Sequence, residues 1–173
     1  MRGRLDQQAR ILGPKDGHAG FLTAMGVRFM VSGQESGGGF ALVEHPMPPR
    51  ALAAPLHRHS REDEYTYVIE GHIGIVSDGV KLVAKAGDLV FKPRNQWHTF
   101  WNLDDTPSRV LEIISPAGFE TYFREMVALP PTATPADRGA IAARYGLEVD
   151  RDSIPRLCSE HGVRFAPPQA PPM

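Results

Sequence analysis

Short apolar segments, each closed by a glycine or a proline, are the feature that most constrains the fold of this chain. The 173 residues include 17 glycines and 16 prolines, and the apolar runs between them have the length of strands. This punctuation predicts many short strands joined by turns. The expected strands cover residues 27–31, 40–45, 64–70, 72–77, 80–84, 88–92, 99–102 and 108–115.

Two of these segments and one turn carry the clearest local signal. Residues 65–69 and 110–114 are rich in β-branched and aromatic side chains, which favour strands. Asp78-Gly79 lies between two apolar runs and predicts a tight hairpin, because both residues tolerate a positive φ. The Ser-Gly-Gly-Gly run at 36–39 predicts a flexible loop.

The pattern changes after residue 115. Apolar residues then recur at helical spacing, and further helices are expected over 135–145 and 153–162. We therefore predict a strand-rich barrel or sandwich over 1–115, a helical extension over 116–165 and a mobile proline-rich tail over 166–173. The first helix carries a stripe that we interpret as a core face: Phe119, Tyr122, Phe123 and Met126.

Composition excludes several classes of protein. No run of about 18 apolar residues exists, so no membrane-spanning segment is expected. A net charge of −1 and a pI near 6.7 argue against a nucleic-acid-binding surface. Cys158 is the only cysteine, and the first residues lack the apolar segment of a secretory signal, so we expect a cytoplasmic protein without a disulfide.

A group of histidines and one glutamate are candidate metal ligands. His57 and His59 are two positions apart, so in a strand both imidazoles project from the same face. Glu64 follows after a short bend, and His98 comes from a separate strand. Three imidazoles and one carboxylate suit Fe, Mn, Ni, Co, Cu or Zn, and they leave open positions on a six-coordinate ion.

The remaining histidines and the acids near the candidate ligands have simpler interpretations. A lone histidine is more often a surface or hydrogen-bonded residue than a ligand, and the acids at positions 62 and 63 follow an arginine and are expected to be solvated. The residues placed in this class are His18, His45, His72, His161, Glu62 and Asp63.

The spacing around the candidate ligands resembles the first motif of the cupin family, G(X)5HXH(X)3-4E(X)6G. His57, His59, Glu64 and Gly71 match its positions, whereas Leu52 or a neighbour replaces the opening glycine.

The second cupin motif, G(X)5PXG(X)2H(X)3N, is also matched. Its positions correspond to Gly87, Pro93, His98 and Asn102. Asn95 stands where the family has glycine, and asparagine is the next most tolerated residue in a left-handed turn.

The resemblance implies an all-β fold, a cupin jelly-roll-like β-barrel with its motif core over 52–102, followed by the short helices of the extension. It also implies that His57, His59, Glu64 and His98 hold one divalent transition metal ion. Cupins of this plain type often dimerise through edge strands, so a homodimer is expected.

Strand alternation suggests which side chains line the cavity around the metal. If Glu64 points inward, Thr66 and Val68 do the same. His98 carries Phe100 inward, and Leu89 and Phe91 are expected to join from the preceding strand. The strand at 27–31 presents either Arg28 and Met30 or Phe29 and Val31, and we retain the first pair as candidates. Trp97 and Trp101 have the opposite parity and are expected to pack against a C-terminal helix or a partner subunit.

Three functions are compatible with such a site, because cupins include several kinds of enzyme and plain binding proteins. The first is a dioxygenase resembling the quercetinase-like cupins, acting on a small aromatic or hydroxylated molecule, with Glu64 as ligand and proton acceptor. The second is a non-oxidative isomerase, lyase or cyclase that needs further acid–base groups, for which Glu44, His45 and Arg28 are candidates. The third is a small-ligand-binding protein without turnover.

Overall fold

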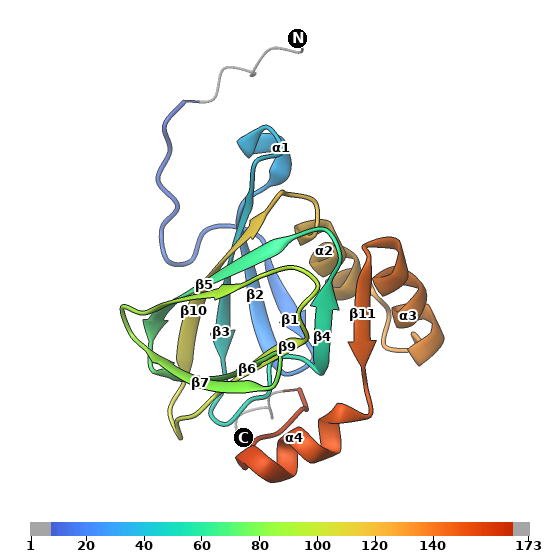
Figure 1. The fold of residues 1–173 in the computed structure, drawn as a ribbon. Helices are drawn as coiled ribbons and strands as arrows, with labels where there is room; N and C mark the ends of the chain where they lie inside the picture. Colours follow the sequence, from blue (N-terminus) through green and yellow to red (C-terminus); the bar gives the residue numbers. More distant parts are fainter. Residues whose placement is uncertain (1–7, 168–173) are drawn as a thin grey trace, which may run out of the picture.

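The computed structural model describes residues 8–167, in which two antiparallel β-sheets face each other and the C-terminal helices lie beside and below them (Figure 1). The first sheet contains, in order, β1 (Ala19–Leu22), β2 (Met25–Val31), β3 (Ala41–Met47), β10 (Ser108–Ser115), β5 (Asp63–Glu70) and β8 (Leu89–Lys92). The second contains β11 (Leu147–Asp150), β4 (Leu56–His59), β9 (His98–Asn102), β6 (His72–Ser77) and β7 (Val80–Lys85). The helices are α1 (Gly33–Ser36), α2 (Glu120–Ala128), α3 (Pro135–Arg144) and α4 (Ser153–His161). This jelly-roll arrangement confirms the predicted all-β fold with C-terminal helices.

Left-handed backbone occurs where the turn residues predict it. Asp78 and Gly79 have φ values of 49° and 82° and connect β6 to β7, with Ser77 paired to Val80. Asn95 has a φ of 65°, so asparagine does adopt the conformation expected at that position. The predicted loop over 36–39 begins instead with a residue of the one-turn helix α1.

The core lies between the sheets and is filled by the inward face of each strand. In β10 every second residue is buried, and Val110, Glu112 and Ile114 face inward. In β2 the inward residues are Val27 and Phe29. The sequence left open whether Phe29 or the pair Arg28 and Met30 faces inward. Phe29 faces the core, and strand alternation therefore turns Arg28 and Met30 to the other side of the sheet.

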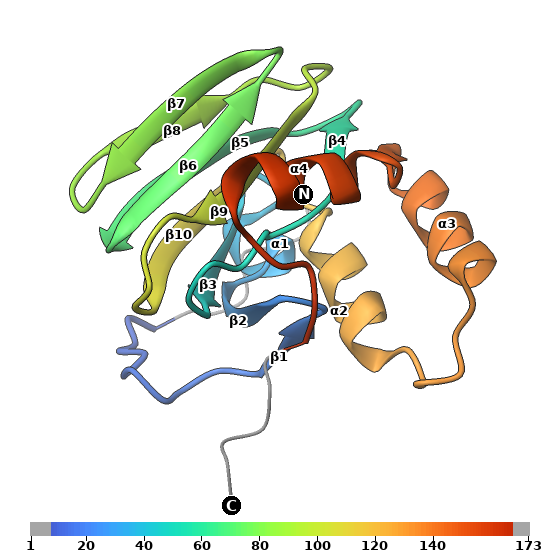
Figure 2. The ribbon, with the colours of Figure 1, turned by 90° about the horizontal axis from the view of Figure 1, so that it is seen from below.

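The C-terminal extension is part of the fold and not a separate appendage. β11 pairs with β4 along its whole length, from Leu147 opposite His59 to Asp150 opposite Leu56. Figure 2 shows α2 beside the first strands and α3 on the outer side of α2, with α4 crossing near the second sheet. The extension therefore adds a strand next to the strand that carries two candidate ligands.

The two tryptophans have different neighbours. Trp101 is buried and stacks on His161 at the end of α4, with ring centroids 3.9 Å apart. Gly74, its partner on β6, must lack a side chain, because a Cβ there would lie 2.3 Å from the indole. Trp97 instead lies beneath the guanidinium of Arg58, 5.0 Å from the ring centre. The predicted packing against a C-terminal helix is therefore confirmed for Trp101, whereas the contact given for Trp97 is with Arg58 on β4.

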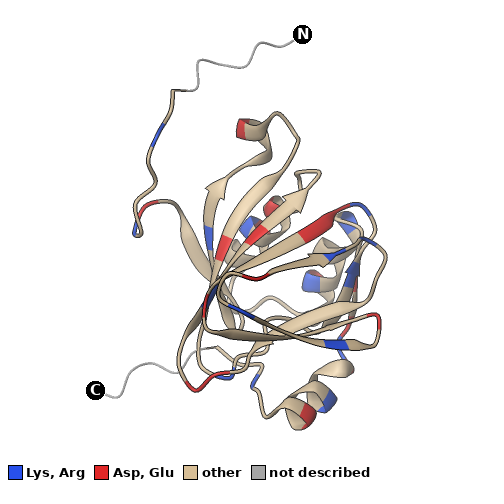
Figure 3. Cartoon of the chain, turned by 60° about the vertical axis from the view of Figure 1, so that its left-hand side comes forward, with Lys and Arg blue, Asp and Glu red and all other residues tan. Residues whose placement is uncertain are grey.

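Charged residues are distributed over the whole fold. Figure 3 shows basic and acidic residues interspersed on strands and helices of the described part of the chain. No helix within residues 8–167 has the length and apolar character needed to cross a membrane. The predicted proline-rich tail falls, from residue 168 onward, outside the described residues.

Candidate metal centre

The four candidate ligands converge between the two sheets. His57 and His59 come from β4, His98 from β9 and Glu64 from β5, so the second sheet supplies the imidazoles and the first sheet the carboxylate. One potential ligand atom of each residue lies within 4.8 Å of the others. His57 and His98 are directly opposed across the β4–β9 pair, with ring centroids 4.5 Å apart.

Hydrogen bonds orient two of the three imidazoles. His57 donates from Nδ1 to the carbonyl of Pro55 at 2.8 Å, and His98 donates from Nδ1 to the carbonyl of Gln96 at 3.0 Å. In His57 the Nε2 atom is then the one that carries a lone pair, and Nε2 of His98 lies 3.1 Å from Oε2 of Glu64. Backbone carbonyls that fix the outer nitrogen in this way are typical of metal-binding histidines.

His59 gives the strongest evidence that the cluster fits a metal ion. Its side chain is 1% exposed, and neither Nδ1 nor Nε2 makes a hydrogen bond to any residue that the structure describes. Nε2 lies 3.3 Å from Oε1 of Glu64, and the edge-to-face ring of Phe119 covers the imidazole at a centroid distance of 4.2 Å. A buried polar side chain without a hydrogen bond is costly, and coordination to a cation removes that cost.

The protonation states also suit a cation. Burial lowers the pKa of His57 well below 6.5 and that of His59 to about 4, so both imidazoles are neutral near pH 7. Burial by itself would raise the pKa of Glu64, but the charge of Lys92 and the nearby His59 and His98 hold it well below 4.5. Neutral imidazoles and an ionised carboxylate are the forms that bind a divalent transition metal.

A buried lysine and a second glutamate adjoin the cluster. Nζ of Lys92 lies 2.8 Å from Oε2 of Glu64 and 2.8 Å from Oε1 of Glu112. Glu112 also accepts a hydrogen bond from the hydroxyl of Thr66 at 2.8 Å. The sequence interpretation missed Lys92 and Glu112. Their signal was a charged residue at an inward position of an alternating strand.

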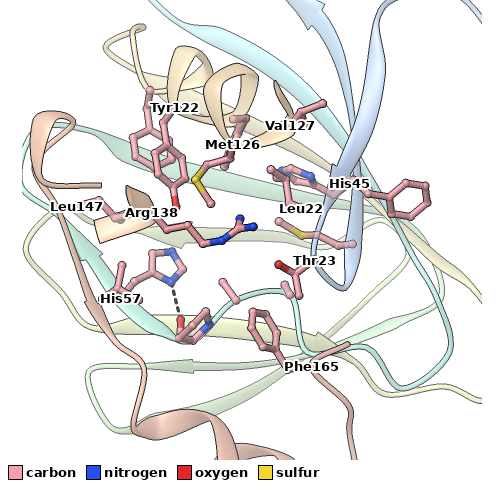
Figure 4. Close-up of a pocket in the computed structure, with 18 of the residues that line it drawn as sticks. Leu22, Thr23, His45, His57, Tyr122, Met126, Val127, Arg138, Leu147 and Phe165 are labelled. Atoms are coloured by element: carbon pink, nitrogen blue, oxygen red, sulfur yellow. Dashed lines mark hydrogen bonds between the residues drawn. The ribbon is translucent and has the colours of Figure 1, made fainter. Parts of the chain in front are cut away.

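A pocket of about 530 Å³ opens beside the cluster (Figure 4). His57 and Glu64 form part of its wall, which makes the candidate metal centre accessible to a small molecule. Most of the other lining side chains are apolar, as in ordinary small-molecule sites. They come from the β1–β2 turn, from inward positions of the sheets and from the C-terminal extension.

Three of the predicted substrate-binding residues point inward as expected. Phe100 is 4% exposed and lines the pocket. Thr66 is buried with its hydroxyl bonded to Glu112, and Val68 lies in the core cluster. Neither Thr66 nor Val68 is among the residues that line the pocket. Among these three, only Phe100 is thus placed to contact a ligand there.

The other three predicted substrate-binding residues are turned away from the pocket. Phe91 is 53% exposed and stacks on Tyr65, because pairing with β5 turns Lys92 inward and therefore Phe91 outward; the same parity exposes Leu89. Arg28 donates to Glu44 on the outer face of the first sheet, with Nε 2.8 Å from Oε2. Met30 has the parity of Arg28. Their inward placement was wrong because strand alternation gives two faces without saying which one is the core.

Several residues outside the predicted substrate-binding set face the pocket or the cluster. His45 is 1% exposed, lines the pocket and donates from Nδ1 to the carbonyl of Gly26 at 2.8 Å; burial lowers its pKa. Glu62 is 6% exposed, not solvated, and burial raises its pKa to about 7. The stripe on α2 serves both purposes, because Phe119 and Phe123 belong to the core while they and Tyr122 and Met126 line the pocket. Position in the fold, and not local sequence, assigns these roles.

Comparison with known proteins places this fold and site in one class. Residues 44–114 match the family model described as "Cupin domain". The structure of an RmlC-like cupin from Shewanella frigidimarina superposes with a TM-score of 0.55 over 68% of this chain and 99% of that chain, at 20% identity. Residues 44–114 thus match a cupin domain, and all four candidate ligands lie within that segment.

Two curated relatives match over shorter segments. Quercetin 2,3-dioxygenase of Bacillus subtilis is 26% identical over 105 residues, which are 61% of this chain and 31% of that protein. Oxidoreductase iacF of Pestalotiopsis fici is 44% identical over 48 residues, which are 27% of this chain and 24% of that protein. The chain thus spans less than a third of the length of either relative.

Proposed function

We propose that this protein is a metal-dependent cupin oxidoreductase of the dioxygenase type, acting on a small hydroxylated and mainly aromatic molecule. The observation that carries the proposal is the contact between the candidate metal centre and a mostly apolar pocket, because His57 and Glu64 belong to both. The segmental likeness to a quercetin dioxygenase and to an oxidoreductase supports the same reaction class.

The chain's own residues supply binding and proton transfer. A redox-active ion on the three histidines and Glu64 would supply the reaction with molecular oxygen, in which one O2 is incorporated per substrate and no external reductant is needed. Phe100, Phe119 and Phe123 provide flat apolar surface for an aromatic ring at the pocket wall.

Two pocket groups can accept the proton of a substrate hydroxyl. Glu64 is ionised and faces the pocket, although its ion pair with Lys92 makes it a weak base. His45 is neutral, and since its Nδ1 donates to Gly26, its Nε2 is the nitrogen able to accept a proton. We assign the ligand role to Glu64, retain it as a candidate proton acceptor and add His45 as a second.

The position of His45 also favours an alternative function. A non-oxidative isomerase, lyase or cyclase needs an acid–base group in the pocket besides the metal ligands, and His45 is such a group. Glu44 and Arg28, the other two candidates for this role, pair with each other on the outer face of the sheet and do not line the pocket. The alternative therefore depends on His45.

Oxygen uptake tests the proposal directly. The protein is loaded in turn with Fe, Mn, Ni or Cu and mixed with a panel of polyhydroxylated aromatics, and oxygen consumption is followed with an electrode. We expect uptake that requires one of these metals and disappears in His98→Ala. His72→Ala is the matched control, because His72 lies on the surface and bonds to Asp104.

Each other outcome points to a different function. A metal-loaded protein that binds an aromatic polyol but consumes no oxygen and leaves the compound intact contradicts the dioxygenase and favours a binding protein. Conversion under anaerobic conditions that is lost in His45→Gln supports the non-oxidative enzyme.

A further inference from the structure

Arg138 is a cation in a mostly apolar pocket, and residues 8–167 provide no counter-ion for it. It comes from the first half of α3, is half-buried and extends into the pocket in Figure 4. Within residues 8–167 its guanidinium makes no ion pair and no hydrogen bond, whereas Arg144 on the same helix pairs with Glu125 on the surface. The described part of the chain thus provides an ion-pair partner for Arg144 and none for Arg138, which faces the cavity.

A second arginine and a tyrosine adjoin it. Arg151 lines the same pocket and also has no ion pair among the described residues. Tyr122 lines the pocket as well; burial raises the pKa of its hydroxyl, and the charges of Arg151 and Arg138 oppose this rise. One part of the pocket wall is therefore positively charged.

The acidic residues of the pocket do not offset this charge. Glu64 and Glu112 line it, but both are already paired with Lys92, and Glu64 is also a candidate ligand of a divalent ion. With such an ion bound, the formal charges of the pocket sum to a positive value. The guanidinium of Arg138 is half-buried and loses part of its hydration, which is unfavourable, and an anionic ligand compensates for this loss.

We propose that Arg138 is a specificity-determining residue that selects ligands with a carboxylate. Its planar fork of N–H donors matches the two oxygens of a carboxylate. The apolar body of the ligand would lie against Phe119 and Phe123, and its hydroxyl would face the cluster. A cavity of about 530 Å³ accommodates a hydroxylated aromatic acid of this kind. The inference rests on the proposed function, because it names the substrate class for that same site.

Binding of matched probes tests the assignment without turnover. Calorimetry compares 3,4-dihydroxybenzoate with catechol, and 4-hydroxybenzoate with phenol, in each case on metal-free protein and on protein loaded with redox-inert zinc. We expect each acid to bind at least about tenfold more tightly than its neutral counterpart, as one charge-assisted pair provides. In Arg138→Gln the affinity for the acids falls to that for the phenols, which is itself unchanged.

Two variants control for the structural effects of the substitution. Arg144→Gln removes an arginine from the same helix outside the pocket and keeps the full preference for the acids. Arg138→Lys keeps the charge but loses the fork, so its preference is intermediate. Equal affinity for acids and phenols in the unaltered protein, retention of the preference in Arg138→Gln, or no measurable binding of either acid at about 10 mM would overturn the proposal.

The result is separable from the test of the proposed function. A preference that depends on Arg138, found together with no oxygen uptake, leaves the ligand assignment intact and removes the dioxygenase. Oxygen uptake together with equal binding of acids and phenols supports the dioxygenase and removes the role of Arg138 in ligand selection.

Discussion

Nζ of Lys92 lies 2.8 Å from Oε2 of Glu64, and the two residues are directly opposed in the β5–β8 pair. The same ammonium group reaches Glu112 at 2.8 Å, so one buried cation serves two buried carboxylates. All three side chains are at most 5% exposed. Because of this pairing, the carboxylate of the candidate metal centre stays ionised before any metal binds.

Removing that cation should destabilise the metal-free protein. Lys92→Met leaves Glu64 and Glu112 buried without their counter-ion, which we expect to cost about 3–5 kcal/mol of unfolding free energy. Urea denaturation measures the loss, and added zinc should recover part of it because the ion partly replaces the missing charge. Lys81→Met is the control, since Lys81 is exposed and pairs with Glu160. Equal stability of the two variants would contradict this account.

Metal content should depend on the four candidate ligands. We expect His57→Ala, His59→Ala and His98→Ala each to lower the bound metal by at least about tenfold, since second-shell changes alone cost that much in metal sites. Glu64→Gln should weaken binding less, because it keeps one ligating oxygen. Elemental analysis of purified protein measures occupancy, with His72→Ala as the surface control. Unchanged metal content in the His57→Ala/His59→Ala double variant would remove the assignment.

Acid should destabilise the metal-free protein. Burial lowers the pKa of His45, His57 and His59, so the unfolded chain binds more protons than the folded protein below about pH 6.5. Stability is therefore complete above that pH and falls as the pH decreases, by up to about 1.4 kcal/mol per pH unit for each imidazole. Glu62, with its pKa raised to about 7, acts in the opposite direction.

A comparison of variants isolates the contribution of His45 to this pH dependence of stability. Urea denaturation between about pH 5 and 8, carried out in a Glu62→Gln background, should show a slope that decreases when His45→Gln is added. His72→Gln should leave the slope unchanged, since that side chain is at the surface. A slope that is the same with and without His45 would refute the contribution of this residue.

Phe119 should couple the C-terminal extension to the metal centre. Its ring is 2% exposed, packs edge-on against His59 and contacts Phe123 and Tyr122. We expect Phe119→Ala to lower the free energy of unfolding by about 3–5 kcal/mol, because it leaves a cavity in the core. It should also weaken zinc binding, because His59 loses the surface that holds its ring. Phe119→Leu, which keeps most of the apolar volume, should bind zinc more nearly as the unaltered protein does. Calorimetric titration measures the zinc affinity of both variants, and an unchanged affinity in Phe119→Ala would disprove the coupling.

Much of the fold was predictable because its signals are local. The Asp78-Gly79 hairpin and the strand that contains Glu112 follow from turn chemistry and β propensity, which act over a few residues. The outward direction of Phe91 was not predictable in the same way. It depends on which residue of β8 lies opposite Glu64, and that register is set by pairing between distant segments.

The sequence by itself determined the candidate ligands and the strand-rich fold, since His57, His59, Glu64 and His98 are specified by fixed spacings. The tertiary structure decided what surrounds them. Glu64 belongs to one sheet and the histidines to the other, so only the packing of the sheets brings Lys92 and Glu112 next to the cluster. Arg138 reaches the pocket only because the extension pairs with β4 and folds back over the site. These contacts join segments far apart in the chain, and no local pattern encodes them.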